Sequence, residues 1–151
     1  MKIAALIARI LLGLVFAGLG SLPFFIQNPP PQPGLAGEFY TVFYQSHWVQ
    51  FVAFAQVVAG LLLLANRYVP VALIIVAAFL YNSYAFHITM VPILIALPIV
   101  ATILWLLVAL QYRDVFAPIF RAKPADGATL ASSSVGRRIE ASDRTTIGDE
   151  A

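Results

Sequence analysis

Residues 69–110 read VPVALIIVAAFLYNSYAFHITMVPILIALPIVATILWLLVAL, a run of 42 residues without Asp, Glu, Lys or Arg. As one helix this run would extend about 63 Å, twice the roughly 30 Å of a bilayer's hydrocarbon core. It must therefore fold back once. The best place for the hairpin is Thr89–Pro92, because a residue that precedes proline leaves the helical region easily. The run predicts two spans, at about 69–89 and 92–111, and Pro98 is expected to kink the second.

Two more apolar segments precede this run, at about 2–22 and 47–65, and each is close to the length of a membrane span. The first is expected to end before Pro23, because proline breaks a helix. Its apolar stretch also resembles a secretory signal, but it is longer than a usual signal core of about 7–15 residues, which favours an uncleaved span. Only a short polar connection around Arg67 separates the second segment from the next one. These two spans are therefore predicted to be antiparallel neighbours.

The first span carries a face of small residues and one charge. Gly13, Ala17, Gly20 and Ser21 recur at spacings of three and four, which lets another helix approach closely. Arg9 lies one to two turns into the span, from where its side chain is expected to reach back to the headgroups.

The connection between the first two spans has two parts. Residues 27–34 contain four prolines and are not expected to be helical. Residues 35–46 form an amphipathic, aromatic stretch that predicts a short helix at the membrane surface, where aromatic rings favour the headgroup level. An ordered loop is the alternative.

Every basic residue falls at the amino end, in the connection between the second and third spans, or at the carboxyl end. The other two connections carry none. Under the positive-inside rule this predicts an all-α membrane protein, a four-span transmembrane helix bundle over residues 1–112 with both termini cytoplasmic, in the inner (cell) membrane. Residues 113–151 are predicted to be a cytoplasmic disordered tail, because beyond Arg121 too little apolar surface remains to offset the entropy of ordering.

The composition excludes several classes of function. Hydrophobic residues make up 61% of the chain and charged residues only 11%, whereas a soluble domain has about 25% charged residues. The absence of cysteine excludes disulfides and thiolate chemistry within this chain. No basic patch alternates with aromatic residues on a polar surface, so nucleic acid is not an expected partner. Without an intramembrane Asp or Glu near its two histidines, the chain is not expected to bind a metal.

Polar residues inside the spans are the candidates for function, because they are costly in lipid. Their depth in the membrane, counted along each span, predicts that several of them converge in one outward-facing pocket. The predicted pocket residues are Gln56, Asn82, Ser83, Tyr84 and His87, together with His47 and Gln50, which begin the second span. His87 could bind a proton, a metal or the carbonyl of a quinone. The alternative is that Gln56 and Asn82 only join helices by hydrogen bonds, and that the two histidines anchor the membrane interface.

Three segments resemble the DoxX family of small membrane proteins. They are Ala8-Arg9-Ile10-Leu11-Leu12-Gly13-Leu14-Val15-Phe16, then Gly60-Leu61-Leu62-Leu63-Leu64-Ala65-Asn66-Arg67-Tyr68-Val69-Pro70, and Phe86-His87. The resemblance covers about residues 3–112, and its specificity comes from the order and spacing of the segments. It implies a four-helix membrane bundle whose polar positions here are Arg9, Asn82 and His87. The Pro-rich insert before Leu35 departs from the shorter loop common in the family.

Some members of this family are similar to a small subunit of a thiosulfate:quinone oxidoreductase, or associate with thiol and oxidative-stress enzymes. The resemblance therefore implies a membrane subunit that assists a quinone-linked or stress-related redox complex. It fixes no cofactor, and a quinone or a lipid held between the helices is the candidate ligand. Membrane lipid, a redox protein and a second copy of the chain are the partners that this interpretation allows. A transporter of small molecules or lipids, and a structural scaffold whose tail recruits a cytoplasmic protein, are the alternatives.

Overall fold

Every regular element in the described part of the chain, residues 2–26 and 31–120, is a helix in this computed structural model. Long helices are α1 (Lys2–Phe25), α3 (Trp48–Leu64), α4 (Val69–Thr89) and α5 (Ala96–Ala109), and α2 (Gly34–Gln45) is shorter. Single turns make up η1 (Pro92–Leu94), η2 (Leu110–Tyr112), α6 (Arg113–Phe116) and η3 (Ala117–Phe120). Residues up to Phe116 belong to one compact unit, and η3 belongs to a second one.

Among the described residues, three helical segments are long and apolar enough to cross a membrane. They are α1, α4 and the segment that starts at Pro92. A fourth span is obtained if α2 and α3, which are bent by 84° relative to each other, count as one. Large apolar side chains also face outward, such as Phe25, 81% exposed, and Phe54, 65% exposed. These features are those of an all-α membrane bundle.

The predicted hairpin between the last two spans is confirmed. Helix α4 covers the predicted 69–89, and its last turn is closed by a hydrogen bond from the Met90 N–H to the Phe86 carbonyl. Val91, the residue before Pro92, has left the helical region with φ −138° and ψ 66°. The chain then turns through η1 into α5.

One expectation about proline is wrong, and the kink expected at Pro98 stays a prediction. Pro98 lies inside the apolar segment that starts at Pro92 and in the first turn of α5, where its missing N–H has no helical partner to lose. The irregularity of this span lies before Pro98, at the joint between η1 and α5. Pro23 does not end α1, which continues to Phe25, and the Ile26 N–H still bonds to the Leu22 carbonyl. So close to the end of a helix, proline removes a single hydrogen bond.

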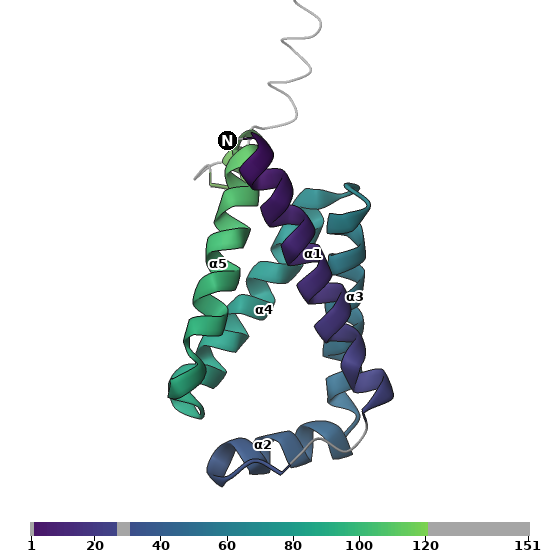
Figure 1. The fold of residues 1–151 in the computed structure, drawn as a ribbon, viewed down its shortest axis with the longest axis vertical. Coiled ribbons are helices and arrows are strands. Elements are labelled where there is room, and N and C mark those ends of the chain that lie inside the picture. Colours follow the sequence, from purple (N-terminus) through teal and green to yellow (C-terminus); the bar gives the residue numbers. More distant parts are fainter. Residues whose placement is uncertain (1, 27–30, 121–151) are drawn as a thin grey trace, which may run out of the picture. The chain divides into compact units, whose positions relative to one another are not determined.

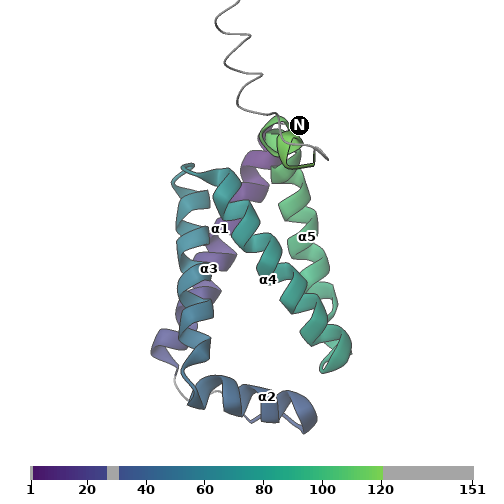
Figure 2. The same ribbon diagram turned by 180° about the vertical axis from the view of Figure 1, so that it is seen from behind.

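Helices α1 and α3 pack along each other, and α4 runs antiparallel to α3 and beside α5 (Figures 1 and 2). The core combines residues of all four helices: Ala8, Leu12, Phe16, Ala59, Leu63, Val69, Ala72, Leu73, Val76, Leu80 and Val108. Phe16 meets Phe79 edge to face at 5.2 Å between ring centroids. The Trp105 indole N–H donates to the Leu73 carbonyl at 2.8 Å, which fixes α5 to α4.

The predicted small-residue face of α1 is confirmed, and its partner is α3. A Cβ atom placed on Gly60 would collide with the backbone nitrogen of Ala17 and would lie 2.8 Å from the Gly13 carbonyl oxygen. A Cβ atom on Gly20 would lie 2.8 Å from that of Gln56. The two backbones therefore approach so closely that only small residues fit between them.

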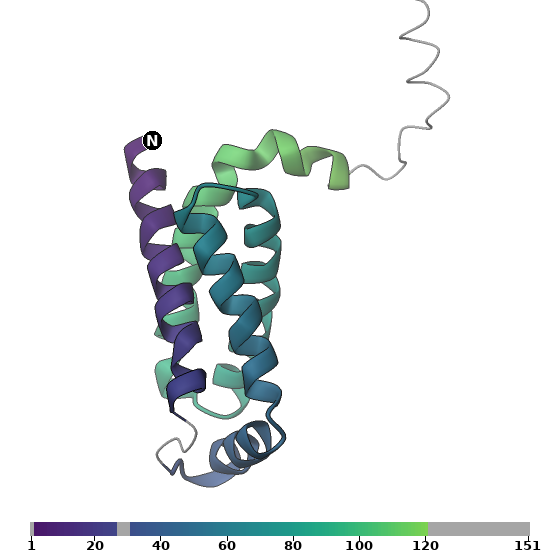
Figure 3. The same ribbon diagram turned by 90° about the vertical axis from the view of Figure 1, so that its right-hand side faces the viewer.

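The two ends of this unit differ. At the arginine end, α1 and α4 begin while α3 and α5 end, and Arg9, Arg67 and Arg113 belong to this end (Figure 1). At the α2 end, helix α2 crosses the opposite ends of the long helices (Figures 1 and 3). Its bounds confirm the predicted short helix at 35–46 and exclude the alternative of an ordered loop.

The predicted tail starts differently from expectation. Residues 113–120 form the short helices α6 and η3, which were expected to be disordered. Helix α6 continues the helical path of α5 and η2, and Phe116 packs against the core cluster. The rest of the predicted tail, residues 121–151, and residues 27–30 of the Pro-rich segment lie outside the described residues.

Candidate functional site

His87 is the candidate residue that the structure buries most deeply. It lies in the last turn of α4, and 9% of its surface is exposed. Its Nδ1 atom lies 3.4 Å from the Val91 carbonyl oxygen, and its ring meets that of Phe86 edge to face at 5.3 Å. Because a carbonyl only accepts, Nδ1 must carry the proton when this contact is a hydrogen bond. The neutral ring then offers Nε2 as an acceptor.

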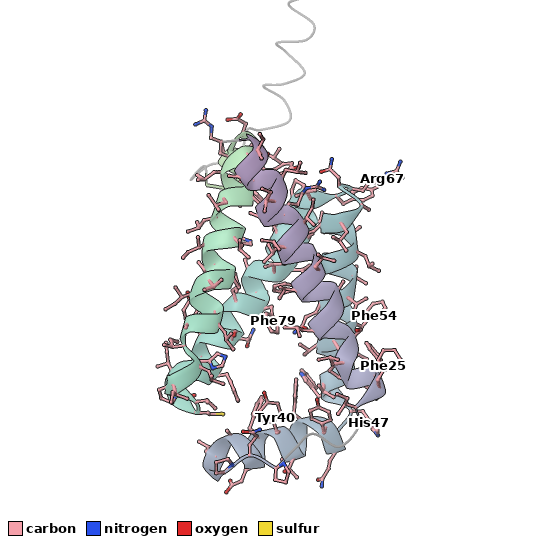
Figure 4. The ribbon with its side chains drawn as sticks, in the orientation of Figure 1. Phe25, Tyr40, His47, Phe54, Arg67 and Phe79 are labelled. Atoms are coloured by element: carbon pink, nitrogen blue, oxygen red, sulfur yellow. The ribbon has the colours of Figure 1, made fainter. Side chains whose placement is uncertain are left out.

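An aromatic cluster joins α2 to the same turn of α4. The Phe86 ring lies 5.5 Å from Phe39 and 5.6 Å from Tyr40, and Phe39 in turn stacks on Phe43 at 5.2 Å. Tyr40 stands on the side of α2 that faces the long helices (Figure 4). Burial, and then the neighbouring Tyr44, raise the pKa of Tyr40, so its hydroxyl stays protonated and remains a hydrogen-bond donor.

An open hollow of about 930 Å³ lies along α2, where the chain turns into α3. Its lining includes Tyr40, Tyr44, His47 and Gln50, and Val49 supplies a buried apolar wall. His47 has a left-handed backbone with φ 58° at the N-cap of α3 (Figure 4). The hollow thus offers phenol, imidazole and amide groups beside aromatic rings. His47 and Gln50, which were expected to share a pocket, do so here.

The remaining predicted pocket residues do not join them. Asn82 and His87 are five residues apart on α4, so they point about 140° apart around the helix. Asn82 is exposed, and its amide donates back to the Ala78 carbonyl of the same helix at 2.8 Å. The expectation that Asn82 and His87 face one pocket is therefore wrong.

Tyr84 and Gln56 serve contacts between helices. The Tyr84 hydroxyl lies 3.0 Å from that of Thr102 on α5, and Thr102 itself donates to the Pro98 carbonyl at 2.7 Å. Gln56 packs against Gly20 on α1. Neither residue lines the hollow, and His87 does not line it either. The Tyr84 hydroxyl joins α4 to α5. The alternative that Gln56 and Asn82 join helices by hydrogen bonds stays a prediction for Gln56 and is wrong for Asn82, which bonds to its own helix.

At the arginine end, Arg9 has a partner that was not predicted. Its guanidinium donates through Nη1 to the Leu63 carbonyl in the last turn of α3, at 2.6 Å, and its reach to the headgroups stays a prediction. The last carbonyls of a helix lack helical partners, and a cation also favours the negative end of the helix dipole. Arg67, in the turn between α3 and α4, is exposed as expected (Figure 4).

Two functional contacts were not predicted. Gly60 was not identified as the partner of Gly13 and Ala17, although a lone glycine inside an apolar run often marks close packing. Tyr40 was assigned only to membrane anchoring, although its i, i+4 spacing from Tyr44 would have shown that one face of α2 holds two phenols. Among residues 2–26 and 31–120, no group of three or more His, Cys, Asp or Glu side chains is placed to hold a metal.

No family model, curated protein or solved structure matches this chain, so the resemblance to the DoxX family stays an expectation from the sequence.

Proposed function

We propose that this protein is a four-span membrane subunit of DoxX type that binds a quinone-class ring at its α2 end and assists a quinone-linked or stress-related redox complex. The observation that carries the proposal is the burial of His87 behind Phe86, which contacts Tyr40 in the wall of the hollow. An ionisable residue buried near the end of a membrane helix is a candidate for function by default.

The positions of the arginines support an orientation with both termini in the cytoplasm. Arg9, Arg67 and Arg113 belong to one end of the bundle, whereas Glu38 lies on α2 at the other. Basic residues concentrate on the cytoplasmic side of membrane proteins. The α2 end would then face outward, with α2 at the membrane surface and α3 as a complete span.

The residues at the α2 end suit a flat ring with oxygen substituents. The hollow falls within the roughly 300–1,000 Å³ of small-molecule sites, and Tyr40, His47 and Gln50 offer hydrogen-bond donors beside aromatic faces. A bound quinone would supply the redox chemistry, and the residues of this chain would hold and orient it. His87 lies behind Phe86 and does not line the hollow, so the ring would have to reach past Phe86 to meet it. With Nδ1 turned to Val91, the Nε2 atom of His87 would then accept from a ring hydroxyl, which favours the reduced, hydroxylated form.

Binding of a short-chain quinol to the purified protein tests the proposal. His87→Phe keeps an aromatic ring of similar bulk and removes both nitrogens, so the affinity should fall by about tenfold, the typical loss of one buried hydrogen bond. Asn82→Leu is the matched control on the same helix. Because Asn82 is exposed and bonds to its own helix, this variant should bind as the parent does.

A second ligand separates hydrogen bonding from packing. The dimethyl ether of the same quinol keeps the ring but cannot donate a hydrogen bond, so it should bind the parent and His87→Phe equally weakly. Equal affinity of the quinol for the parent and for His87→Phe would show that His87 is only an interface residue. Absence of quinone from the gently purified protein, together with no quinol binding, would remove the redox proposal.

A further inference from the structure

A second hollow, of about 560 Å³, lies at the arginine end, away from the proposed quinone site. Its walls come from the start of α1, the turn between α3 and α4, and the end of α5 with η2. The lining residues are Ala5, Leu6, Arg9, Asn66, Val108, Gln111 and Tyr112. The six residues other than Arg9 offer it either hydrogen-bonding groups or apolar carbon, and none of them is acidic.

The half-buried guanidinium of Arg9 gives this hollow a positive charge. One of its N–H groups bonds to the Leu63 carbonyl, and an arginine has five to offer. The described part of the chain holds two carboxylates, and neither lines the hollow. Glu38 is on α2 at the opposite end, and Asp114 lies 3.7 Å from Arg113. A partly desolvated cation that meets no carboxylate here favours an anion from outside the described chain.

We propose that this hollow binds a phosphate group, from an anionic phospholipid headgroup or from free phosphate. The guanidinium fork matches the geometry of phosphate oxygens. The Asn66 and Gln111 amides and the Tyr112 hydroxyl add donors around it, while Ala5, Leu6 and Val108 offer apolar contact for the rest of a lipid. Basic pockets between membrane helices are known to take acidic headgroups. The Arg9 side chain thus fixes α3 through Leu63 and binds the anion with its other N–H groups.

Thermal unfolding of the full chain in a neutral detergent tests this site. Phosphatidylglycerol, phosphatidylcholine and inorganic phosphate are added separately, and the melting temperature is followed against concentration. Phosphatidylglycerol should raise the melting temperature of the parent, whereas phosphatidylcholine should not. A rise with inorganic phosphate at comparable concentration would identify free phosphate as the ligand, and a rise with phosphatidylglycerol alone would identify the lipid.

Arg9→Gln should increase the half-saturating concentration at least about tenfold, as expected for the loss of a charge-assisted contact. Arg67→Gln is the matched control, because it removes one positive charge from an exposed site at the same end. Since Arg9→Gln also removes the contact with Leu63, Tyr112→Phe and Gln111→Leu provide a second test that leaves this contact in place. Each should weaken the response to the ligand without lowering the melting temperature in its absence.

Equal loss of the response in Arg9→Gln and Arg67→Gln would mean that the lipid senses only net charge, and would overturn the site. An unchanged response in both Tyr112→Phe and Gln111→Leu would overturn it as well, even if Arg9→Gln fails to fold.

Discussion

At the scale of single residues, the contact between α1 and α3 depends on Gly60. A Cβ atom there meets only backbone atoms, the nitrogen and Cα of Ala17 and the carbonyl oxygen of Gly13, so no side chain can move aside to make room. Lipid gives little driving force for association of helices, and close van der Waals contact must supply it instead. Even one added methyl group at Gly60 is therefore expected to weaken the van der Waals contact between α1 and α3.

Gly60→Ala is expected to destabilise the protein by about 1–3 kcal/mol, the usual cost of an extra carbon in a packed interior. The melting temperature in detergent should fall by several degrees. Gly18→Ala is the matched control on α1, since a Cβ atom there meets nothing within 4 Å. If the two variants have the same melting temperature, α1 and α3 are apart at Gly60 in solution and the close contact does not exist.

The side of a helix on which a residue lies could be predicted only where the spacing of residues along the chain fixes it. The small face of α1 could be predicted because residues three and four apart share a side of a helix. Its partner could not, because the sequence does not show which helices are neighbours beyond those joined by a short turn. Asn82 and His87 were grouped by depth in the membrane, which ignores the direction in which a side chain points. The Leu63 carbonyl that holds Arg9 is a backbone atom, and no residue type marks it.

At the scale of elements, the turn between α3 and α4 reverses the chain in four residues by using two left-handed positions. Asn66 has φ 55° and Tyr68 has φ 52°, and neither is glycine. Asparagine tolerates this conformation, whereas a side chain such as tyrosine meets steric cost of roughly 1–2 kcal/mol. The tight turn brings Arg67 and the last carbonyls of α3 to the arginine end.

Tyr68→Gly should therefore raise the stability, by up to about 1 kcal/mol, because glycine adopts positive φ freely. Tyr68→Val should lower it, since a β-branched residue is least tolerant of this region. Tyr68 is 72% exposed, so lost packing contributes little to either result. Thermal melting of both variants measures the difference, and a Val variant as stable as the Gly variant would argue against a left-handed turn.

Helix lengths were largely predictable from apolar length, but helix ends only where a polar or proline-containing connection marks them. The bounds of α4 agree with the prediction because short polar or proline-containing connections mark both ends. The expectation failed at Pro23, which was taken as a break. At Pro23 and Pro98 the residue lies within a turn of a helix end, where few hydrogen bonds are at stake.

At the scale of the whole molecule, the proposed arrangement of four spans with both ends inside depends on α3, which has 17 residues. Alone it is at the lower limit of a membrane-spanning helix, and the bend of 84° from α2 sets where it begins. If α2 and α3 together dipped into the membrane and returned, the arginines of the α3–α4 turn and the amino end would lie on opposite sides.

Reporter fusions distinguish these arrangements. Fusions after Asn28 should report outside, and fusions after Arg67 and Arg113 inside, because the basic residues hold those segments in the cytoplasm. The fusion after Arg67 is the decisive one for α3. A fusion after Arg113 that reports outside would rule out an even number of spans.

The pairing of α1 with α3 also means that α1 must wait for its partner during biosynthesis. Gly13 emerges from the ribosome before Gly60 exists, and at about 5–20 residues per second the delay is roughly 2 to 9 s. During this interval the first helix sits in lipid with its small-residue stripe uncovered. Arg9 lacks the Leu63 carbonyl until α3 arrives, so its guanidinium has to be solvated at the headgroups in the meantime. A cysteine pair at positions 20 and 56, where a Cβ atom on Gly20 would lie 2.8 Å from that of Gln56, should accordingly cross-link in stalled nascent chains only after α3 has left the ribosome. Absence of the cross-link from chains in which α3 is already outside the ribosome would mean that α1 has paired with another helix.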